Sequence, residues 1–227
     1  MTRRLGVLGG TFDPVHFGHL DAAGAARAAL GFDDLLFVPS HDPPHRPANP
    51  HATAFHRFAL VALAISGIDG YRASDLELRR EGSSYTADTL RALHAAGWAP
   101  AQIFFILGAD AFAEIATWHE FPAVLDGAHF AIIARPGVTI DAALARTPGL
   151  RSRTRPASAP PDAAGRTGIF LVEAATRDVS STLVRRRLAA GQPLDDLVPS
   201  AVARHIAAHH LYTEDDLHGH DEDTQGR

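Results

Sequence analysis

Short apolar runs alternate with helical patterns along most of this chain. Runs that are almost continuously apolar are typical of strands buried on both faces of a parallel sheet, and they predict strands at residues 4–8, 35–39, 102–107, 129–134 and 168–173. Between them, apolar residues recur every three or four positions, which predicts helices at 18–30, 52–66, 84–96, 110–118, 181–190 and 201–210. This alternation predicts an α/β fold with a doubly wound, mainly parallel, Rossmann-like sheet, helices on both faces, and ligands at the carboxyl ends of the strands.

The domain boundaries follow from the segments that lack this patterning. Residues 147–168 are rich in Pro, Ala, Ser and Arg without periodicity, which predicts a mobile surface loop. Residues 213–227 are acidic and polar, which predicts a disordered tail. Residues 1–212 are therefore expected to form one domain, whose last helix follows "VPS" with Ser200 as its N-cap.

The composition agrees with a single large globular domain, since the 227 residues are 46% hydrophobic and 21% charged. The longest apolar run, residues 128–134, is too short to span a bilayer, so no membrane partner is expected. The first apolar stretch is interrupted by glycines too early for a secretion signal. With no cysteine in the chain either, a cytoplasmic location is expected.

Lysine is absent, and all 21 basic residues are arginine. This excludes Schiff-base chemistry and a Walker A phosphate loop, both of which need a lysine. Any bound anion must be held by arginine, histidine, backbone N–H groups or a metal ion. The net charge of −5 argues against nucleic-acid binding, although a small anionic ligand responds only to the local field.

The most informative stretch is "GGTFDPVHFGHL", residues 9–20, which joins the first predicted strand to the first helix. Gly9 and Gly10 allow a ligand to approach the backbone closely, and a helix N-terminus attracts phosphate. His16 and His19 lie where their ring N–H groups would meet phosphate oxygens. A tight turn with surface histidines is the alternative. A metal site would need a third ligand, and neither HExxH nor the dinucleotide fingerprint GxGxxG occurs here.

Two further motifs follow in order. "VPSHDPPHR", residues 38–46, ends the second strand in a proline-rich loop that carries His45 and Arg46 at a position suited to phosphate. "SSYTADTL", residues 83–90, begins a helix, and for Ser84 and Thr86 the residue types favour helix capping over ligand binding.

Three more chemical candidates lie further along the chain. Asp110, after the buried run in "FFILGADAF", suits ribose hydroxyls or a helix cap. Trp118 offers a flat stacking surface, although core packing is the usual role of a single tryptophan. "RDVSSTLVRRRL", residues 177–188, begins a second helix with hydroxyl groups and Arg185, which suits a triphosphate, whereas Arg186 and Arg187 are expected to be solvated.

Taken in order, these motifs resemble those of bacterial nicotinate-nucleotide adenylyltransferases, a branch of the nucleotidyltransferases that carry HxGH, here "HFGH". The matching set is "GGTFDPVHFGHL", "PPHR", "SSYTADTL", "LGAD…W" and "VSSTLVR", and the resemblance extends from residue 5 to about residue 212. Class I aminoacyl-tRNA synthetases have a related signature, but they combine it with a lysine-containing loop. The resemblance implies transfer of AMP from ATP to nicotinate mononucleotide, which yields nicotinate adenine dinucleotide and pyrophosphate in NAD biosynthesis.

The resemblance also implies roles for individual residues. It assigns catalysis to His16, His19, Arg46 and Arg185. It assigns ATP binding to Gly9, Gly10, Thr11, Phe12, His16, His19, Ser181, Thr182 and Arg185. It assigns nicotinate mononucleotide binding to His45, Ser84, Tyr85, Thr86, Asp110, Trp118, His119 and Arg135. Mg²⁺ is expected on the ATP phosphates and not in a protein metal site.

Two rival functions remain open at this stage. One is a related enzyme with a different acceptor, such as nicotinamide mononucleotide. The other is a nucleotide-binding module that has kept the fold and lost the chemistry, although the intact HxGH and SST…R segments argue against it. The oligomeric state does not follow from the sequence.

Overall fold

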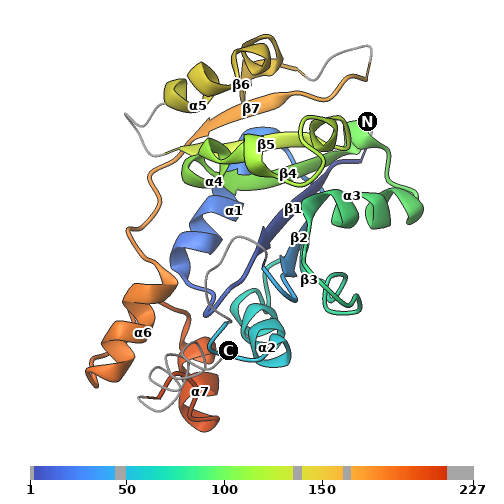
Figure 1. Cartoon of the computed structure of the whole chain (residues 1–227). Helices are drawn as coiled ribbons and strands as arrows, with labels where there is room; N and C mark the ends of the chain where they lie inside the picture. Colours follow the sequence, from blue (N-terminus) through green and yellow to red (C-terminus); the bar gives the residue numbers. More distant parts are fainter. Residues whose placement is uncertain (1–2, 44–49, 135–139, 161–164, 214–227) are drawn as a thin grey trace, which may run out of the picture.

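A seven-stranded, entirely parallel sheet forms the centre of the molecule (Figure 1). The computed structural model describes residues 3–43, 50–134, 140–160 and 165–213. The strands are β1 (Leu5–Gly10), β2 (Asp34–Pro39), β3 (Tyr71–Ala73), β4 (Ile103–Gly108), β5 (His129–Ala134), β6 (Thr154–Pro156) and β7 (Ile169–Glu173), in the order β3-β2-β1-β4-β5-β7-β6. From β1 the strands are added in one direction to β2 and β3, and from β4 they are added in the opposite direction, so the strand order reverses between β1 and β4. Ligands bind at this position in doubly wound folds. The predicted fold class is confirmed.

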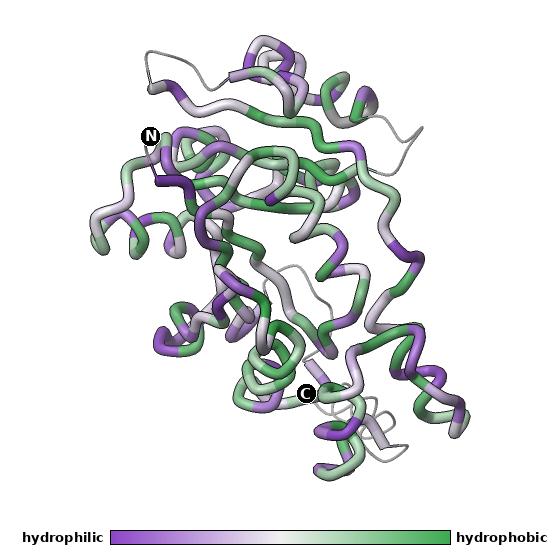
Figure 2. The backbone as a smooth tube through the Cα atoms, turned by 180° about the vertical axis from the view of Figure 1, so that it is seen from behind, coloured by the Kyte–Doolittle hydropathy of each residue, from purple (hydrophilic) through white to green (hydrophobic). Residues whose placement is uncertain are grey.

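Helices cover both faces of this sheet because successive strand residues point to opposite sides. Phe104 and Ile106 belong to one hydrophobic cluster, whereas Phe105 and Leu107 belong to the other. The first cluster packs under α1 (Phe17–Leu30), α2 (Ala54–Ala64), α6 (Ser181–Ala189) and α7 (Ser200–Ala208). The second packs under α3 (Thr86–Ala95), α4 (Ala109–Ala113) and α5 (Asp141–Arg146). Figure 2 shows the resulting contrast between largely hydrophobic strands and helices of mixed character.

Several local predictions need correction. Ser200 is the first residue of α7 and Pro199 is its N-cap, so the predicted Ser200 cap is wrong because the helix begins one residue early. The helix predicted for 110–118 is divided at Glu114, whose φ of −99° and ψ of 11° end α4 before η2 (Ile115–Thr117). The segment 147–168, expected to form a loop, contains the 3₁₀-helix η4 (Pro148–Arg153) and β6. No helix in the described ranges is long and apolar enough to cross a membrane.

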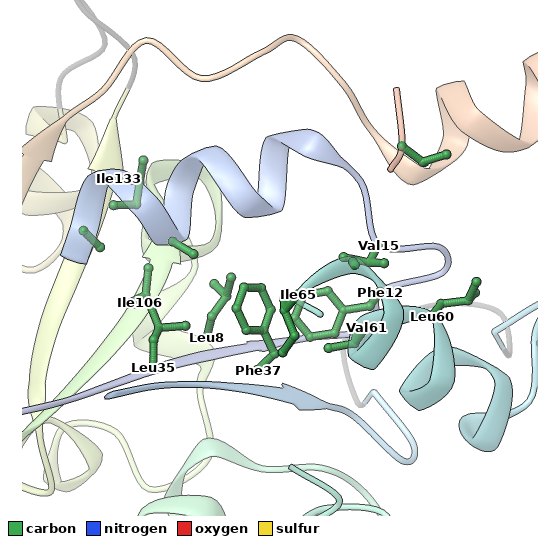
Figure 3. Close-up of a cluster of buried hydrophobic side chains, with 14 of the residues drawn as sticks. Leu8, Phe12, Val15, Leu35, Phe37, Leu60, Val61, Ile65, Ile106 and Ile133 are labelled. Atoms are coloured by element: carbon green, nitrogen blue, oxygen red, sulfur yellow. The ribbon is translucent and has the colours of Figure 1, made fainter. Parts of the chain in front are cut away.

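The loop between β1 and α1 is anchored in the hydrophobic core. Phe12 has a φ of 51°, a left-handed backbone that a bulky residue rarely adopts, yet its ring is only 1% exposed. Figure 3 shows Phe12 and Val15 beside Val61 of α2 and Ile65, the C-cap of that helix. Burial of these two side chains stabilises the unusual backbone and holds the loop against the sheet.

Candidate active site

A cleft of about 650 Å³ opens at the carboxyl ends of β1 and β4, where the strand order reverses. Its walls come from β1, the start of α1, the start of α4 and the segment 176–179 that precedes α6. Four residues that the sequence singles out line it together: Gly9, His16, His19 and Asp110. Arg177 lines it as well, although its place in "RDVSSTLVRRRL" did not predict this position.

The two histidines of the HxGH motif form one unit. Their rings stack with centroids 3.7 Å apart and planes 28° from parallel. The backbone N–H of His16 donates to Nδ1 of His19 at 3.2 Å. A neutral imidazole has one N–H, so this hydrogen bond places the proton of neutral His19 on Nε2. The Phe12 and His19 rings lie edge to face with centroids 4.9 Å apart, and this contact also fixes the orientation of the His19 ring.

His16 is held in its neutral form. Its side chain is buried, and burial lowers its pKa to about 4, an effect that the nearby Asp21 carboxylate only partly opposes. Within the described structure its Nδ1 is buried without a hydrogen-bond partner. A Cβ at Gly18 would lie 3.1 Å from this Nδ1 and 3.2 Å from the carbonyl oxygen of Val179. Glycine between the two histidines therefore lets the segment 176–179 lie close to His16.

Three carbonyl groups of the β1–α1 loop accept hydrogen bonds from distant side chains. Nη1 of Arg57 donates to the carbonyl of Thr11 at 2.8 Å, and Nη1 of Arg185 donates to that of Asp13 at 2.6 Å. The hydroxyl of Ser181 donates to the carbonyl of Pro14 at 2.9 Å. Two residues expected at the phosphates, Ser181 and Arg185, therefore hold the loop in this structure. Thr182 is exposed at the start of α6, with its hydroxyl 3.4 Å from Nη2 of Arg185.

Asp13 organises the other side of the same loop. Its side chain is fully buried, and its carboxylate accepts the backbone N–H groups of His51 and Ala52 at 2.9 and 3.0 Å. Nη1 of Arg185 lies 3.7 Å from the carboxylate. Asp13 therefore joins the loop to the segment before α2 and to α6. Asp13 is part of the "TFDP" segment, but its structural role could not be predicted because the partners of its carboxylate are distant in the chain.

The segment 176–179 is fastened to α1 by a two-pronged ion pair. Nε and Nη2 of Arg177 donate to the two carboxylate oxygens of Asp21 at 2.9 and 2.7 Å, and the backbone N–H of Arg177 donates to the same group at 3.0 Å. The guanidinium also lies 3.8 Å from the centre of the Phe17 ring. These hydrogen bonds from Arg177 lower the pKa of Asp21, so the carboxylate stays charged.

A second group of predicted residues lies around the start of α3. The Tyr85 and His119 rings stack with centroids 4.3 Å apart, which brings the "SSYT" and "TWHEF" segments together. The Ser84 hydroxyl accepts the backbone N–H of His41 at 2.8 Å. Tyr85 is the N-cap of α3 and Thr86 its first residue, so the prediction that Ser84 and Thr86 cap this helix is wrong. The Ser84 hydroxyl instead fixes the loop after β2.

Asp110 and Trp118 differ in their surroundings. Asp110 is exposed in the first turn of α4, where Gly108 is the N-cap and no side chain caps the helix, so the capping alternative for Asp110 is wrong. Trp118 is half-buried and packs edge-on against Phe105 and Phe130, with centroids 6.1 and 6.4 Å away. His45, Arg46 and Arg135 lie outside the described residues. Within the described ranges, no group of three or more His, Asp or Glu side chains is placed to hold a metal ion.

Comparison with known proteins identifies the family. Residues 7–187 match the Cytidylyltransferase-like family model. The chain is 42% identical over 218 residues to a "Probable nicotinate-nucleotide adenylyltransferase" of Symbiobacterium thermophilum, an alignment that covers 95% of this chain and 98% of the relative. The chain belongs to the nicotinate-nucleotide adenylyltransferase family. It is accordingly a nucleotidyltransferase, and the family predicted from the motifs is confirmed.

A second relative supports the family, and a solved structure supports the fold. A protein of the same name from Pseudomonas aeruginosa is 38% identical over 214 residues, which cover 93% of this chain and 98% of that protein. A Plasmodium falciparum nicotinic acid mononucleotide adenylyltransferase complexed with NaAD superposes with a TM-score of 0.70. At 17% identity over 93% of this chain and 98% of that chain, it shows the shared fold.

Proposed function

We propose that this chain transfers the adenylyl group of ATP to nicotinate mononucleotide, forming nicotinate adenine dinucleotide and pyrophosphate in NAD biosynthesis. The observation that carries the proposal is the cleft at the switch point, which unites the histidine pair with Asp110 in a member of this family. In the reaction, a phosphate oxygen of the mononucleotide attacks the α-phosphorus of ATP, and the bond to the pyrophosphate oxygen breaks. That phosphate is already ionised at neutral pH, so catalysis requires positioning and charge stabilisation and no general base.

On the ATP side, we assign the phosphates to the β1–α1 loop and the start of α6. Gly9, Gly10, Thr11 and Phe12 supply backbone and hydroxyl groups beside His16 and His19. The burial that keeps His16 neutral makes it a hydrogen-bond donor and not a cation. Ser181, Thr182 and Arg185 would contact the β- and γ-phosphates, with Arg185 acting on both the loop and the ligand. Mg²⁺ would be carried by the phosphate oxygens of ATP.

On the acceptor side, we assign the ribose to Asp110, the pyridine ring to Trp118, and the nicotinate carboxylate to the Thr86 backbone and the segment after Trp118. The stacked Tyr85 and His119, together with Ser84, support this assignment by placing the two segments in contact. Roles for His45, Arg46 and Arg135 stay predictions, as do the cytoplasmic location and the single-domain organisation.

The reaction is tested directly with the purified protein, ATP, Mg²⁺ and each of the two mononucleotides. Pyrophosphate release and formation of the dinucleotide are expected with nicotinate mononucleotide, with a lower kcat/KM for nicotinamide mononucleotide. Equal or better use of the amide would favour the rival acceptor. Absence of pyrophosphate with either acceptor would favour a binding module.

Replacement of Trp118 by alanine is expected to raise the KM for nicotinate mononucleotide about 10-fold, since stacking of an aromatic base on a side chain contributes roughly 1–3 kcal/mol. The KM for ATP should change little. Because Trp118 also packs on Phe105, Trp118→Phe is the milder companion variant. Trp98, which packs under Arg3 at 5.4 Å from its guanidinium carbon, provides the matched control Trp98→Ala. An unchanged acceptor KM in Trp118→Ala would remove Trp118 from the site.

Replacement of Asp21 by asparagine is expected to raise the KM for ATP about 5-fold, because a partly exposed ion pair contributes roughly 1 kcal/mol. The physical reason is that Arg177 loses its two-pronged partner and the segment 176–179 is no longer fastened beside His16. Asp196→Asn removes a comparable surface pair with Arg187 on α6 and serves as the control. Equal KM values for ATP in Asp21→Asn and Asp196→Asn would contradict a role for the Asp21–Arg177 pair in the cleft.

A further inference from the structure

Arg57, on α2, has the largest of the fully buried side chains in the described part of the chain. Burying a guanidinium is unfavourable unless its donors are satisfied. Here Nε donates to the carbonyl of Ala52 at 3.1 Å, Nη1 to that of Thr11 at 2.8 Å, and Nη2 to that of His41 at 3.3 Å. The planar fork of an arginine fixes the directions of all these hydrogen bonds at once.

Two of these three carbonyl groups belong to segments with different proposed tasks. Thr11 lies in the loop assigned to the ATP phosphates, whereas His41 follows β2 in the loop that leads towards Arg46. The backbone N–H of His41 continues the connection, because it donates to Ser84 next to the Tyr85–His119 stack. A continuous path of hydrogen bonds therefore extends from the ATP loop through Arg57 to the acceptor side.

We propose that Arg57 is a positioning residue, which sets the separation between the ATP loop and the loop after β2 and so aligns the two substrates. This inference rests on the proposed function, since adenylyl transfer needs the acceptor oxygen and the α-phosphorus in line and close together. At 1% exposure Arg57 acts through the backbone of Thr11 and His41. It adds a task for a residue that none of the sequence motifs includes.

The test compares Arg57→Lys with the wild-type enzyme. Lysine keeps the charge but lacks the planar fork, so it cannot donate to the carbonyls of Thr11 and His41 in the directions that the guanidinium fixes. We expect kcat to fall about 100-fold, as for a small misplacement of reacting groups, with a smaller change in either KM. Amide hydrogen exchange should become faster in both loops, residues 10–15 and 38–43. The binding stoichiometry of a non-hydrolysable ATP analogue should stay at the wild-type value, which separates misalignment from partial unfolding.

Arg153→Lys is the matched control. Arg153 is also held by buried acceptors, with Nη2 at 2.7 Å from both the Leu125 carbonyl and the Thr167 hydroxyl, but it lies away from the cleft. Its replacement should leave kcat and the exchange of both loops unchanged. Arg57→Gln, which buries no charge, is the second variant if the lysine form does not fold, and the same pattern is expected.

Two results would overturn the inference: a kcat close to that of the wild type, or faster exchange in one loop without the other. Failure of the proposed function is a separate result, because it would appear as absence of pyrophosphate release by the wild-type enzyme. The exchange measurement would still decide whether Arg57 couples the two loops.

Discussion

Replacement of His19 by alanine is expected to lower kcat for adenylyl transfer about 100- to 1,000-fold, the range found when one preorganised donor to a developing negative charge is removed. The hydrogen bond from the His16 backbone to Nδ1 places the His19 proton on Nε2, in the wall of the cleft. The measurement is steady-state pyrophosphate release at saturating ATP and nicotinate mononucleotide. The thermal unfolding temperature should change little, because His19 contributes to the cleft wall more than to the core.

Two amide variants sharpen this test. Glutamine at position 19 places an N–H donor near the position of Nε2, whereas asparagine reaches only as far as Nδ1. His19→Gln is therefore expected to retain more turnover than His19→Asn. His94 lies on α3, where its Nε2 is 2.8 Å from the carbonyl oxygen of Gly127. The control is His94→Ala, for which near-normal turnover is expected. Near-normal turnover in His19→Ala would exclude His19 from transition-state stabilisation, and equal rates in the two amide variants would exclude a role for Nε2.

The central strands were predictable because they are buried on both faces. All six residues of β5 are buried, and the predicted bounds 129–134 are those of the structure. By contrast, β3 and β6 have three residues each, none of them buried, and they lie at the two edges of the sheet. Such short edge strands carry no periodic signal of their own. Their pairing with β2 and β7 depends on tertiary contacts that a linear pattern does not contain.

The site was predictable to the extent that its chemistry is local in sequence. Gly9 and the histidine pair lie in one short motif, and the start of α4 lies in another. The structure brings both motifs together in one cleft. The partners of buried groups were not predictable, because Arg57 and Thr11 are 46 positions apart and Arg177 and Asp21 are 156 apart. For the same reason, the sequence did not reveal that Ser181 and Arg185 hold the carbonyls of Pro14 and Asp13.

Asp13→Ala is expected to have the largest effect on stability, lowering the free energy of unfolding by roughly 3–5 kcal/mol. The change leaves two N–H groups, of His51 and Ala52, without their acceptor and removes the carboxylate 3.7 Å from Arg185. Urea unfolding followed by circular dichroism measures the difference. The stability of Asp13→Asn should lie between that of the wild type and that of Asp13→Ala, since its amide keeps one acceptor oxygen and loses the charge.

The control is Asp75→Asn, which removes an exposed ion pair with Arg79 at 2.8 Å and should change the stability by less than about 1 kcal/mol. A loss in Asp13→Ala no larger than in this control would show that the β1–α1 loop is held by its apolar anchors, Phe12 and Val15, and not by the buried carboxylate.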